Sequence, residues 1–223
     1  MRRSLVLLAP WVLLAMPVAG PLAAQVEVDF TPRVGVFFPL EDLTQSTDPF
    51  TGLPLTQRAQ TKFNLGGTIG VWLSPSFGFE GTADYNRSGV EQFVGGVPQS
   101  PTIDSHFFAA TGRAMARLGA NRPVAFILSA GAGLVDRGGD FTNGANPPST
   151  SFNGRTDFAG AGGIGVEVRL SRWVKARLDG DVFTYKAQYS SPAFGSTSDL
   201  RQWDAVISFG FTGAFRDYGI PTD

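Results

Sequence analysis

Charged side chains occur at every second position in several segments of this sequence. Lys175, Arg177, Asp179 and Asp181 form one such run. Side chains at alternate positions of a β-strand project from the same face, so these four would line one surface. Two carboxylates spaced in this way could bind a cation, but basic residues beside them favour ion pairs. We therefore interpret Asp179 and Asp181 as partners of Arg177 or Arg169, and we predict no metal site.

Nucleophilic catalysis would need a Ser–His pair or a cysteine thiolate. The sequence has no Cys, and its one His is His106. Ser105 is adjacent to His106, so in a strand the two side chains point to opposite faces. The glycine-rich segment 160–163 is followed by no helical pattern, which argues against a phosphate-binding loop. We expect no enzyme activity and no cofactor, and we interpret His106 as a residue near a membrane interface.

The composition excludes several classes of protein. Of 223 residues, 43% are hydrophobic, which is enough to form a core and argues against disorder throughout. The formal net charge of -1 argues against a nucleic-acid partner, because phosphate binding needs a basic surface. The absence of Cys excludes a disulfide scaffold and a Cys-based zinc site, and a single His excludes a multi-histidine metal site.

The N-terminal segment has the pattern of an export signal. Arg2 and Arg3 form a basic start, an uncharged apolar stretch covers 5–20, and small residues follow at Ala23 and Ala24. A membrane anchor is the alternative, but the stretch is short of the roughly 20 residues that a spanning helix needs. We predict a signal peptide over 1–24, a barrel domain over 26–215 and a short periplasmic tail over 216–223.

The rest of the chain alternates between apolar and polar residues with a period of two. In the segment 77–86, for example, Phe77, Phe79 and Tyr85 fall on one face, and Glu80 and Asp84 fall on the other. This alternation is typical of a β-strand with one apolar face. The same test predicts eight strands, at 26–39, 63–73, 77–86, 105–118, 124–135, 156–170, 173–186 and 201–215.

Long and short connections alternate between these strands. The long ones are predicted at 40–62, 88–104, 136–155 and 187–200, and tight turns separate the other strands. In an up-and-down meander, this places all long loops at one end and all short turns at the other. That layout is typical of a transmembrane β-barrel, with short periplasmic turns and longer extracellular loops. The predicted fold is therefore all-β, an eight-stranded antiparallel up-and-down transmembrane barrel.

Alternation alone leaves the direction of the apolar face open. A soluble lipocalin-like barrel would place it inside, and Gly70-Val71-Trp72 imitates the lipocalin Gly-x-Trp signature, although in the second strand rather than the first. The rhythm of the loops favours the membrane barrel instead. Aromatic residues also gather towards strand ends, as interfacial girdles would require: Phe37, Phe38, Phe63, Trp72, Phe77, Tyr85, Phe107, Phe108, Phe126, Phe158, Trp173, Phe183, Tyr185, Trp203 and Phe215.

With the apolar face outward, the alternate positions carry charge into the barrel interior. The predicted interior charge network consists of Glu27, Asp29, Arg33, Glu80, Asp84, Arg113, Arg117, Asp157, Glu167, Arg169, Lys175, Arg177, Asp179, Asp181 and Asp204. Buried charges are tolerated when they are paired, so we expect neighbouring strands to supply partners. Glu80 can face Arg113 or Arg117, and Glu167 and Arg169 can face Lys175 and Arg177. We predict a filled interior, with a gated ion path as the alternative.

Three segments resemble the OmpA/OmpX-type eight-stranded outer-membrane β-barrel domain: PRVGVFFP at 32–39, FGFEGTADY at 77–85 and ISFGFTGAF at 207–215. The resemblance implies a location in the outer membrane of a Gram-negative-type bacterium and contact with outer-membrane lipid. It also implies insertion by the barrel-insertion machinery, whose C-terminal signal is matched by Ser208, Gly210 and Phe215. Gly213 and the residues after Phe215 depart from that signal.

These observations lead to one main hypothesis about function. We expect an integral outer-membrane barrel with a structural or surface-interaction role, a closed interior and an extracellular partner at the polar long loops. The alternatives are a narrow channel or transporter of small apolar solutes, and a soluble lipocalin-like binding barrel.

Overall fold

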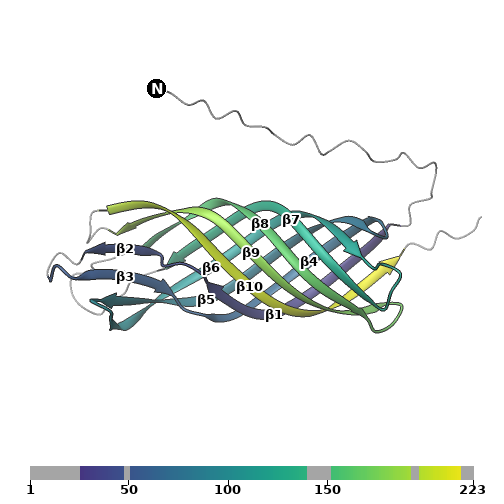
Figure 1. Ribbon diagram of the computed structural model, residues 1–223, viewed down its shortest axis with the longest axis horizontal. Helices are drawn as coiled ribbons and strands as arrows, with labels where there is room; N and C mark the ends of the chain where they lie inside the picture. Colours follow the sequence, from purple (N-terminus) through teal and green to yellow (C-terminus); the bar gives the residue numbers. More distant parts are fainter. Residues whose placement is uncertain (1–25, 48–50, 140–151, 192–195, 217–223) are drawn as a thin grey trace, which may run out of the picture.

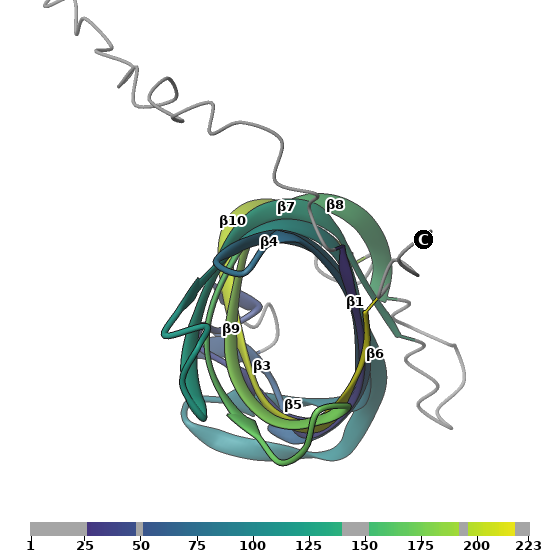
Figure 2. The same cartoon turned by 90° about the vertical axis from the view of Figure 1, so that its right-hand side faces the viewer.

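The strands close into a single antiparallel barrel. A computed structural model describes residues 26–47, 51–139, 152–191 and 196–216. The barrel strands are β1 (Glu27–Pro39), β4 (Lys62–Ser74), β5 (Phe77–Val94), β6 (Val97–Leu118), β7 (Val124–Gly139), β8 (Phe152–Arg169), β9 (Val174–Ser191) and β10 (Ser196–Arg216). Each pairs with its neighbours in chain order, and β1 pairs with β10 to close the ring (Figure 2). The predicted fold class is confirmed.

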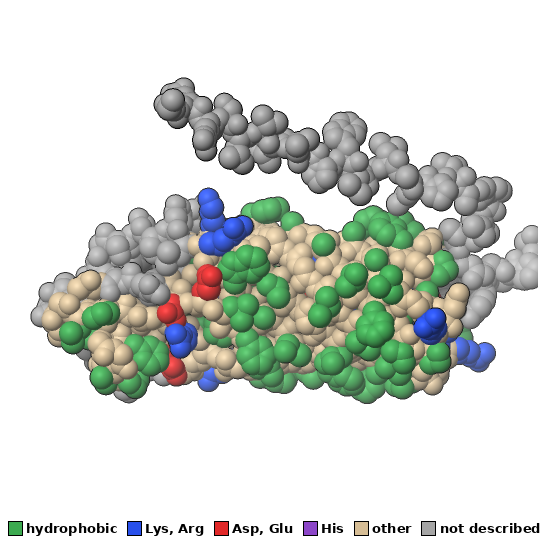
Figure 3. Space-filling view, viewed as in Figure 1, with side chains coloured by type: hydrophobic (Ala, Val, Ile, Leu, Met, Phe, Trp, Pro, Cys, Tyr) green, Lys and Arg blue, Asp and Glu red, His purple; other side chains and the backbone are tan. Residues whose placement is uncertain are grey.

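The direction of the apolar face is also as expected. Outward side chains such as Ile69 and Phe209 are 57% and 42% exposed, whereas Glu80 and Arg113 are 4% and 2% exposed. Apolar side chains cover the middle of the outer surface (Figure 3). A soluble ligand-binding barrel would place these groups the other way round, so the lipocalin-like alternative is wrong. Trp72 of the lipocalin-like triplet lies buried inside the barrel.

The short turns lie at one end of the barrel, which we call the short-turn end. The turns there join β4 to β5, β6 to β7 and β8 to β9. Ser171 helps to form the last of them, because its hydroxyl oxygen accepts a hydrogen bond from the backbone N–H of Val174 at 3.0 Å. β1 begins and β10 ends at this same end, with Glu27 opposite Arg216 (Figure 1).

At the opposite end, which we call the hairpin end, the predicted long loops are largely wrong. The segment 88–104 continues β5 and β6 into a long hairpin that turns at Gly95 and Gly96. Both glycines have positive φ, 57° and 82°, which suits the tight turn of a two-residue hairpin. β7, β8, β9 and β10 also run past their predicted ends. The alternation disappears there because a strand outside lipid needs no apolar face, although its backbone pairing continues.

The segment 40–62 is also predicted as a loop, and it contains a short hairpin instead. Its strands are β2 (Thr44–Thr47) and β3 (Pro54–Ala59). β3 pairs with the outer part of β5, in the place that β4 occupies nearer the short-turn end. β2 pairs with β3, and it lies at the edge of the sheet (Figure 1). Beside β5, the barrel wall is therefore formed by β4 nearer the short-turn end and by β3 at the hairpin end. The change occurs where β1 ends at Pro39 and β4 begins at Lys62.

The aromatic girdle prediction is right for some residues and wrong for others. Phe63, Phe158, Trp173 and Phe215 are exposed on the outer face near strand ends, in line with the prediction. The side chains that the structure buries inside the barrel instead are Phe37, Trp72, Phe107, Phe183 and Tyr185. Their positions match the inward parity of their strands, so alternation predicts them better than residue type does.

Two predicted segments lie largely outside the described residues. The signal peptide over 1–24 falls entirely outside them, and of the predicted tail only Arg216 is described, as the last residue of β10. Within the part of the chain that the structure describes, no helix has the length and apolar character to cross a membrane.

Candidate functional site

The candidate site is the charged interior of the barrel, and its first layer lies near the short-turn end. Glu27 and Asp29 project inward from β1, two residues apart. The Lys175 ammonium lies 2.5 Å from Glu27 and 3.0 Å from Asp29. Arg117 contacts Asp29 at 3.2 Å and Glu167 at 3.3 Å. Two cations from β6 and β9 thus hold three carboxylates from β1 and β8.

Trp72 anchors this layer to the barrel wall. Its indole N–H donates a hydrogen bond to Asp29 at 2.8 Å. The Arg117 guanidinium lies 3.7 Å from the centroid of the same indole ring. A buried indole needs an acceptor for its N–H, and the face of its ring attracts a cation. Asp29 supplies the acceptor and Arg117 the cation, so Trp72 contacts both members of this ion pair.

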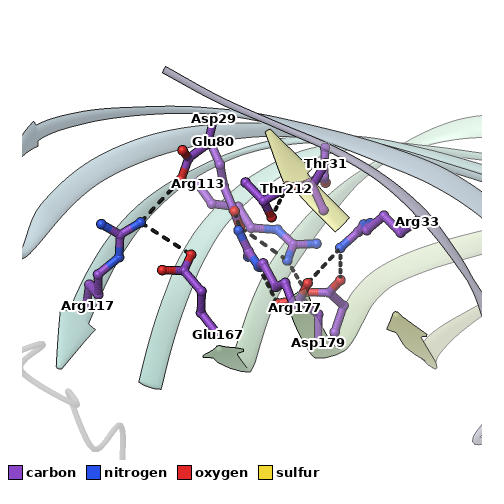
Figure 4. Close-up of polar contacts among 12 residues, drawn as sticks. Asp29, Thr31, Arg33, Glu80, Arg113, Arg117, Glu167, Arg177, Asp179 and Thr212 are labelled. Atoms are coloured by element: carbon purple, nitrogen blue, oxygen red, sulfur yellow. Dashed lines mark hydrogen bonds and ion pairs between the residues drawn. The ribbon is translucent and has the colours of Figure 1, made fainter. Parts of the chain in front are cut away.

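The second layer lies in the middle of the barrel and centres on Arg33 (Figure 4). The Arg33 guanidinium donates to Asp84 on β5 at 2.5 Å and to Asp181 on β9 at 2.8 Å. Asp181 also accepts a hydrogen bond from Arg113 on β6. The amide of Asn64 donates to the second oxygen of Asp84 at 2.9 Å. These contacts join five strands, β1, β4, β5, β6 and β9.

Arg177 completes this layer. It donates to Glu80 on β5 at 2.9 Å and to Asp179 on its own strand at 2.8 Å. Asp179 and Asp181, the acidic pair that could have bound a cation, are thus both engaged by arginines. Among the described residues, no cluster of three or more His, Cys, Asp or Glu side chains has a geometry suited to a metal ion.

Inward glycines provide space for the carboxylates of the second layer. A Cβ on Gly66 would overlap the carboxylate of Asp84, one on Gly163 that of Asp181, and one on Gly165 that of Asp179. Each of these glycines is paired with its acid, or lies beside it, on a neighbouring strand. An eight-stranded barrel is just wide enough for side chains to fill. A residue larger than glycine at any of these three positions would therefore compete with the carboxylate for the same space.

The third layer, towards the hairpin end, is mainly aromatic. The Phe107 ring lies between Phe37 and Phe183, with centroids 4.8 Å and 5.8 Å away. All three are fully buried. Asp204 accepts hydrogen bonds from Arg137 at 2.7 Å and from the Tyr185 hydroxyl at 2.6 Å. This layer follows the charged network along the barrel axis, towards the hairpin end.

Most residues predicted for the interior network are placed inside. Thirteen of the fifteen are buried, and Asp157 is half-buried. Arg169 is an exception: it is exposed and donates to the backbone carbonyl of Ala120 at 3.2 Å, because β8 ends at this residue. Arg137 was missed, since it falls in a segment predicted as a loop.

The predicted pairings between neighbouring strands are found in two cases. Arg113 lies 3.9 Å from Glu80, and Lys175 lies 3.7 Å from Glu167. Shorter contacts, such as those of Arg33 with Asp84 and of Arg177 with Glu80, instead join strands that are not adjacent in the sheet. Long arginine side chains can reach across so narrow a barrel, which a strand-neighbour argument does not consider. Overall, eight carboxylates and six cations are buried in the described interior.

His106 and Ser105 lie on opposite faces of β6. The Ser105 hydroxyl is buried and donates to the backbone carbonyl of Gly138 at 2.9 Å. His106 faces outward, with Nε2 3.1 Å from Asp136, and Asp136 also accepts from the Thr156 hydroxyl at 3.0 Å. The two candidates for a nucleophile and its base are therefore held apart by the strand.

A notch of about 1230 Å³ occurs where the barrel wall changes strands. Its lining includes Leu40, Asp42, Arg58, Glu91 and Arg201. The Asp42 carboxylate accepts a hydrogen bond from Arg58 at 2.7 Å, which raises the pKa of that guanidinium above its ordinary value. The amide of Gln60 donates to Glu91 at 2.6 Å. The notch is polar and lies outside the apolar belt.

The residues of the predicted assembly signal occupy the closing strand β10. Ser208 is buried and Phe215 is 64% exposed on the outer face. A Cβ on Gly210 would overlap the backbone carbonyl of Pro32 on β1, so glycine is needed for β1 and β10 to approach here. Recognition of these residues by the insertion machinery remains a prediction.

Solved structures share this architecture. The crystal structure of the outer membrane protein OprG from Pseudomonas aeruginosa matches 86% of this chain and 96% of its own, with a TM-score of 0.64 and 16% identity. The solid-state NMR structure of the outer membrane protein AlkL in DMPC lipid bilayers matches 99% of both chains, with a TM-score of 0.55 and 14% identity. No protein-family model and no curated protein matches the sequence.

The outward apolar belt, the buried charges and the shared architecture define the class of this chain. It is an eight-stranded outer-membrane β-barrel protein. In barrels of this class, short turns face the periplasm and longer connections face the cell exterior. The short-turn end is accordingly periplasmic and the hairpin end extracellular.

Proposed function

We propose that this protein is a closed barrel with a structural or surface-interaction role in the outer membrane of a Gram-negative-type bacterium. The observation that supports the proposal is the filled interior. Two ion-paired layers and the layer of Phe37, Phe107 and Phe183 follow one another along the axis, and the side chains in them are buried. Eight strands leave an interior just wide enough for such side chains.

The hairpin end supplies a surface for interaction. The β2–β3 and β5–β6 hairpins extend beyond the apolar belt and carry exposed apolar side chains, with Leu53 47% and Val97 60% exposed. Connections held on a rigid scaffold commonly carry binding functions. The extracellular partner in this proposal would therefore contact these hairpins.

A narrow channel or a route for small apolar solutes is the second candidate, and the notch favours it. It lies beside Leu40 and Arg201, where the β2–β3 hairpin takes the place of β4 in the barrel wall. If ions passed through the interior, the excess of buried carboxylates would favour cations over anions.

Conductance separates the two candidates. Purified protein is reconstituted into planar bilayers, with incorporation verified by flotation of matched proteoliposomes and by heat-modifiable migration on a gel. The closed barrel predicts no steady conductance and no faster uptake of an apolar dye into the proteoliposomes. Steady conductance would support the channel instead, and faster dye uptake would support the solute route.

We also propose the division of the chain into a signal peptide over 1–24, a barrel over 26–215 and a periplasmic tail over 216–223. N-terminal sequencing of the membrane-extracted protein tests the first boundary. A mature chain that retains the apolar segment 5–20 would contradict it.

A further inference from the structure

Two basic residues face each other on the outer surface of the barrel. Lys186 on β9 and Arg201 on β10 are directly opposite in the strand register, and both are exposed. Like charges in this arrangement destabilise a sheet unless something compensates them. Among the residues that the structure describes, neither has an acidic partner. Three acids line the notch that Arg201 also lines. Asp42 is paired with Arg58, and Glu91 accepts a hydrogen bond from the Gln60 amide. The third, Glu41, is exposed and forms none of the described ion pairs with Arg201 or Lys186.

This basic pair lies at the extracellular border of the apolar belt. The next outward pair along the same strands is Thr184 and Trp203, and Ala205 with Val182 follows. The Arg201 guanidinium lies 5.8 Å from the Trp203 ring. Figure 3 shows charged side chains gathered where the apolar surface ends. An interfacial tryptophan marks the level of lipid headgroups, so Lys186 and Arg201 lie at headgroup depth in the outer leaflet.

An apolar groove begins directly below the pair. It has a volume of about 520 Å³, and its lining includes Trp203, Thr184, Val182, Gly180 and Gly162. Outward glycines form its floor. A Cβ on Gly162 would meet only a backbone oxygen at 3.8 Å, and one on Gly180 would meet only a side-chain carbon of Ile164 at 3.9 Å. Larger side chains would fit at both positions, and they would fill the groove.

We propose that this surface is a specific lipid site. The phosphate of an outer-leaflet glycolipid is held by Lys186 and Arg201, and one of its acyl chains lies in the groove over Gly162 and Gly180. The charge of the pair fits a phosphate, which can accept charge-assisted hydrogen bonds from both side chains. The continuity of the pair with an apolar groove favours a phosphorylated lipid over a free phosphate ion.

A second groove on the barrel provides a matched comparison. It has a volume of about 560 Å³, and Ile69, Gly81 and Ala83 help to line it. The basic residue further along β5, Arg87, already has an acidic partner, because its guanidinium lies 3.5 Å from Asp104. A Cβ on Gly81 would meet nothing within 4 Å. This groove has the apolar part of the proposed site without its uncompensated charge.

Native mass spectrometry of the full chain, released from phosphatidylcholine nanodiscs that contain bisphosphorylated lipid A, tests the proposal. The wild type should retain lipid A, and Lys186→Ser with Arg201→Ser should lower the retained fraction roughly tenfold, since two charge-assisted contacts are lost. Gly162→Leu should lower it as well. The matched variants Arg87→Ser and Gly81→Leu should retain lipid A as the wild type does.

Two further measurements test whether the site recognises the phosphate as part of the lipid. Dephosphorylated lipid A should not be retained, and inorganic phosphate should not displace lipid A. In nanodiscs of phosphatidylcholine alone, the double serine variant should be at least as stable to urea as the wild type, because it removes a like-charge pair. Retention that is independent of the phosphate or of the two basic residues would overturn the proposal, as would displacement by phosphate alone.

Discussion

Arg177 and Glu80 form an ion pair, with 2.9 Å between guanidinium nitrogen and carboxylate oxygen, from strands on opposite sides of the barrel. Both side chains are buried. Neither could remain unpaired in the interior at low cost, so the pair fixes how far apart β5 and β9 lie. The same reasoning applies to Arg33, which joins β1 to Asp84 and Asp181.

The first prediction concerns Arg33. Arg33→Ala would leave the buried Asp84 without its ion-pair partner and would remove one of the two arginines that contact Asp181. We expect it to lower the free energy of unfolding by about 3–5 kcal/mol. The measurement is urea unfolding in lipid vesicles followed by tryptophan fluorescence. Arg58→Ala is the control, because it removes an ion pair whose arginine side chain is 57% exposed and should cost about 0–1 kcal/mol. Equal effects of the two changes would argue against an energetically important interior network.

The second prediction separates pairing from burial. Arg177→Met alone should destabilise the barrel strongly, because it leaves the buried Glu80 and Asp179 without the cation nearest to both. Glu80→Leu alone should cost less, because Arg177 keeps its contact with Asp179. The double variant should lose less stability than the sum of the two single losses, since both single changes remove the same Glu80–Arg177 contact. A double-mutant cycle measures this coupling. Additive effects would contradict a direct interaction between Glu80 and Arg177.

The third prediction concerns the space that glycine provides. Gly163→Ala should destabilise the barrel by about 1–3 kcal/mol, because the new methyl group would overlap the Asp181 carboxylate. Gly112→Ala is the matched control. Gly112 is also within a barrel strand, but a Cβ there meets nothing within 4 Å. Urea unfolding of both variants in the same lipid is the measurement, and a larger loss for Gly112→Ala would contradict the packing seen here.

Alternation in the sequence was sufficient for the barrel and for most of the interior. Glu80 and Asp84 were placed inward by their parity alone, and the structure buries both. The alternation of apolar and polar residues no longer predicts strands beyond the lipid, because only contact with lipid requires an apolar outer face. Outside lipid, β5 and β6 continue as a hairpin without an apolar face, and Arg137 lies in such an extension, so its ion pair with Asp204 was missed.

Partner choice inside the barrel could not be predicted from the order of strands. That order suggested that Arg117 could face Glu80, whereas Arg117 contacts Asp29 and Glu167 instead. The strand stagger and the length of each side chain decide which charges meet, and neither can be obtained from alternation. Residue type was a weaker guide still, because Phe107 and Phe183 pack inside although aromatic residues were expected at the interfaces.

The last prediction tests the direction in which the apolar face points. Ile69 is 57% exposed within the apolar belt, and Leu53 is 47% exposed at the hairpin end. Ile69→Arg should lower the free energy of unfolding by about 2–4 kcal/mol, because it places a charge in the hydrocarbon region of the bilayer. Leu53→Arg should have little effect, since that side chain is outside the lipid. Urea unfolding in vesicles compares the two. Similar small losses would mean that Ile69 contacts water, and the assignment of the outer face to lipid would then be wrong.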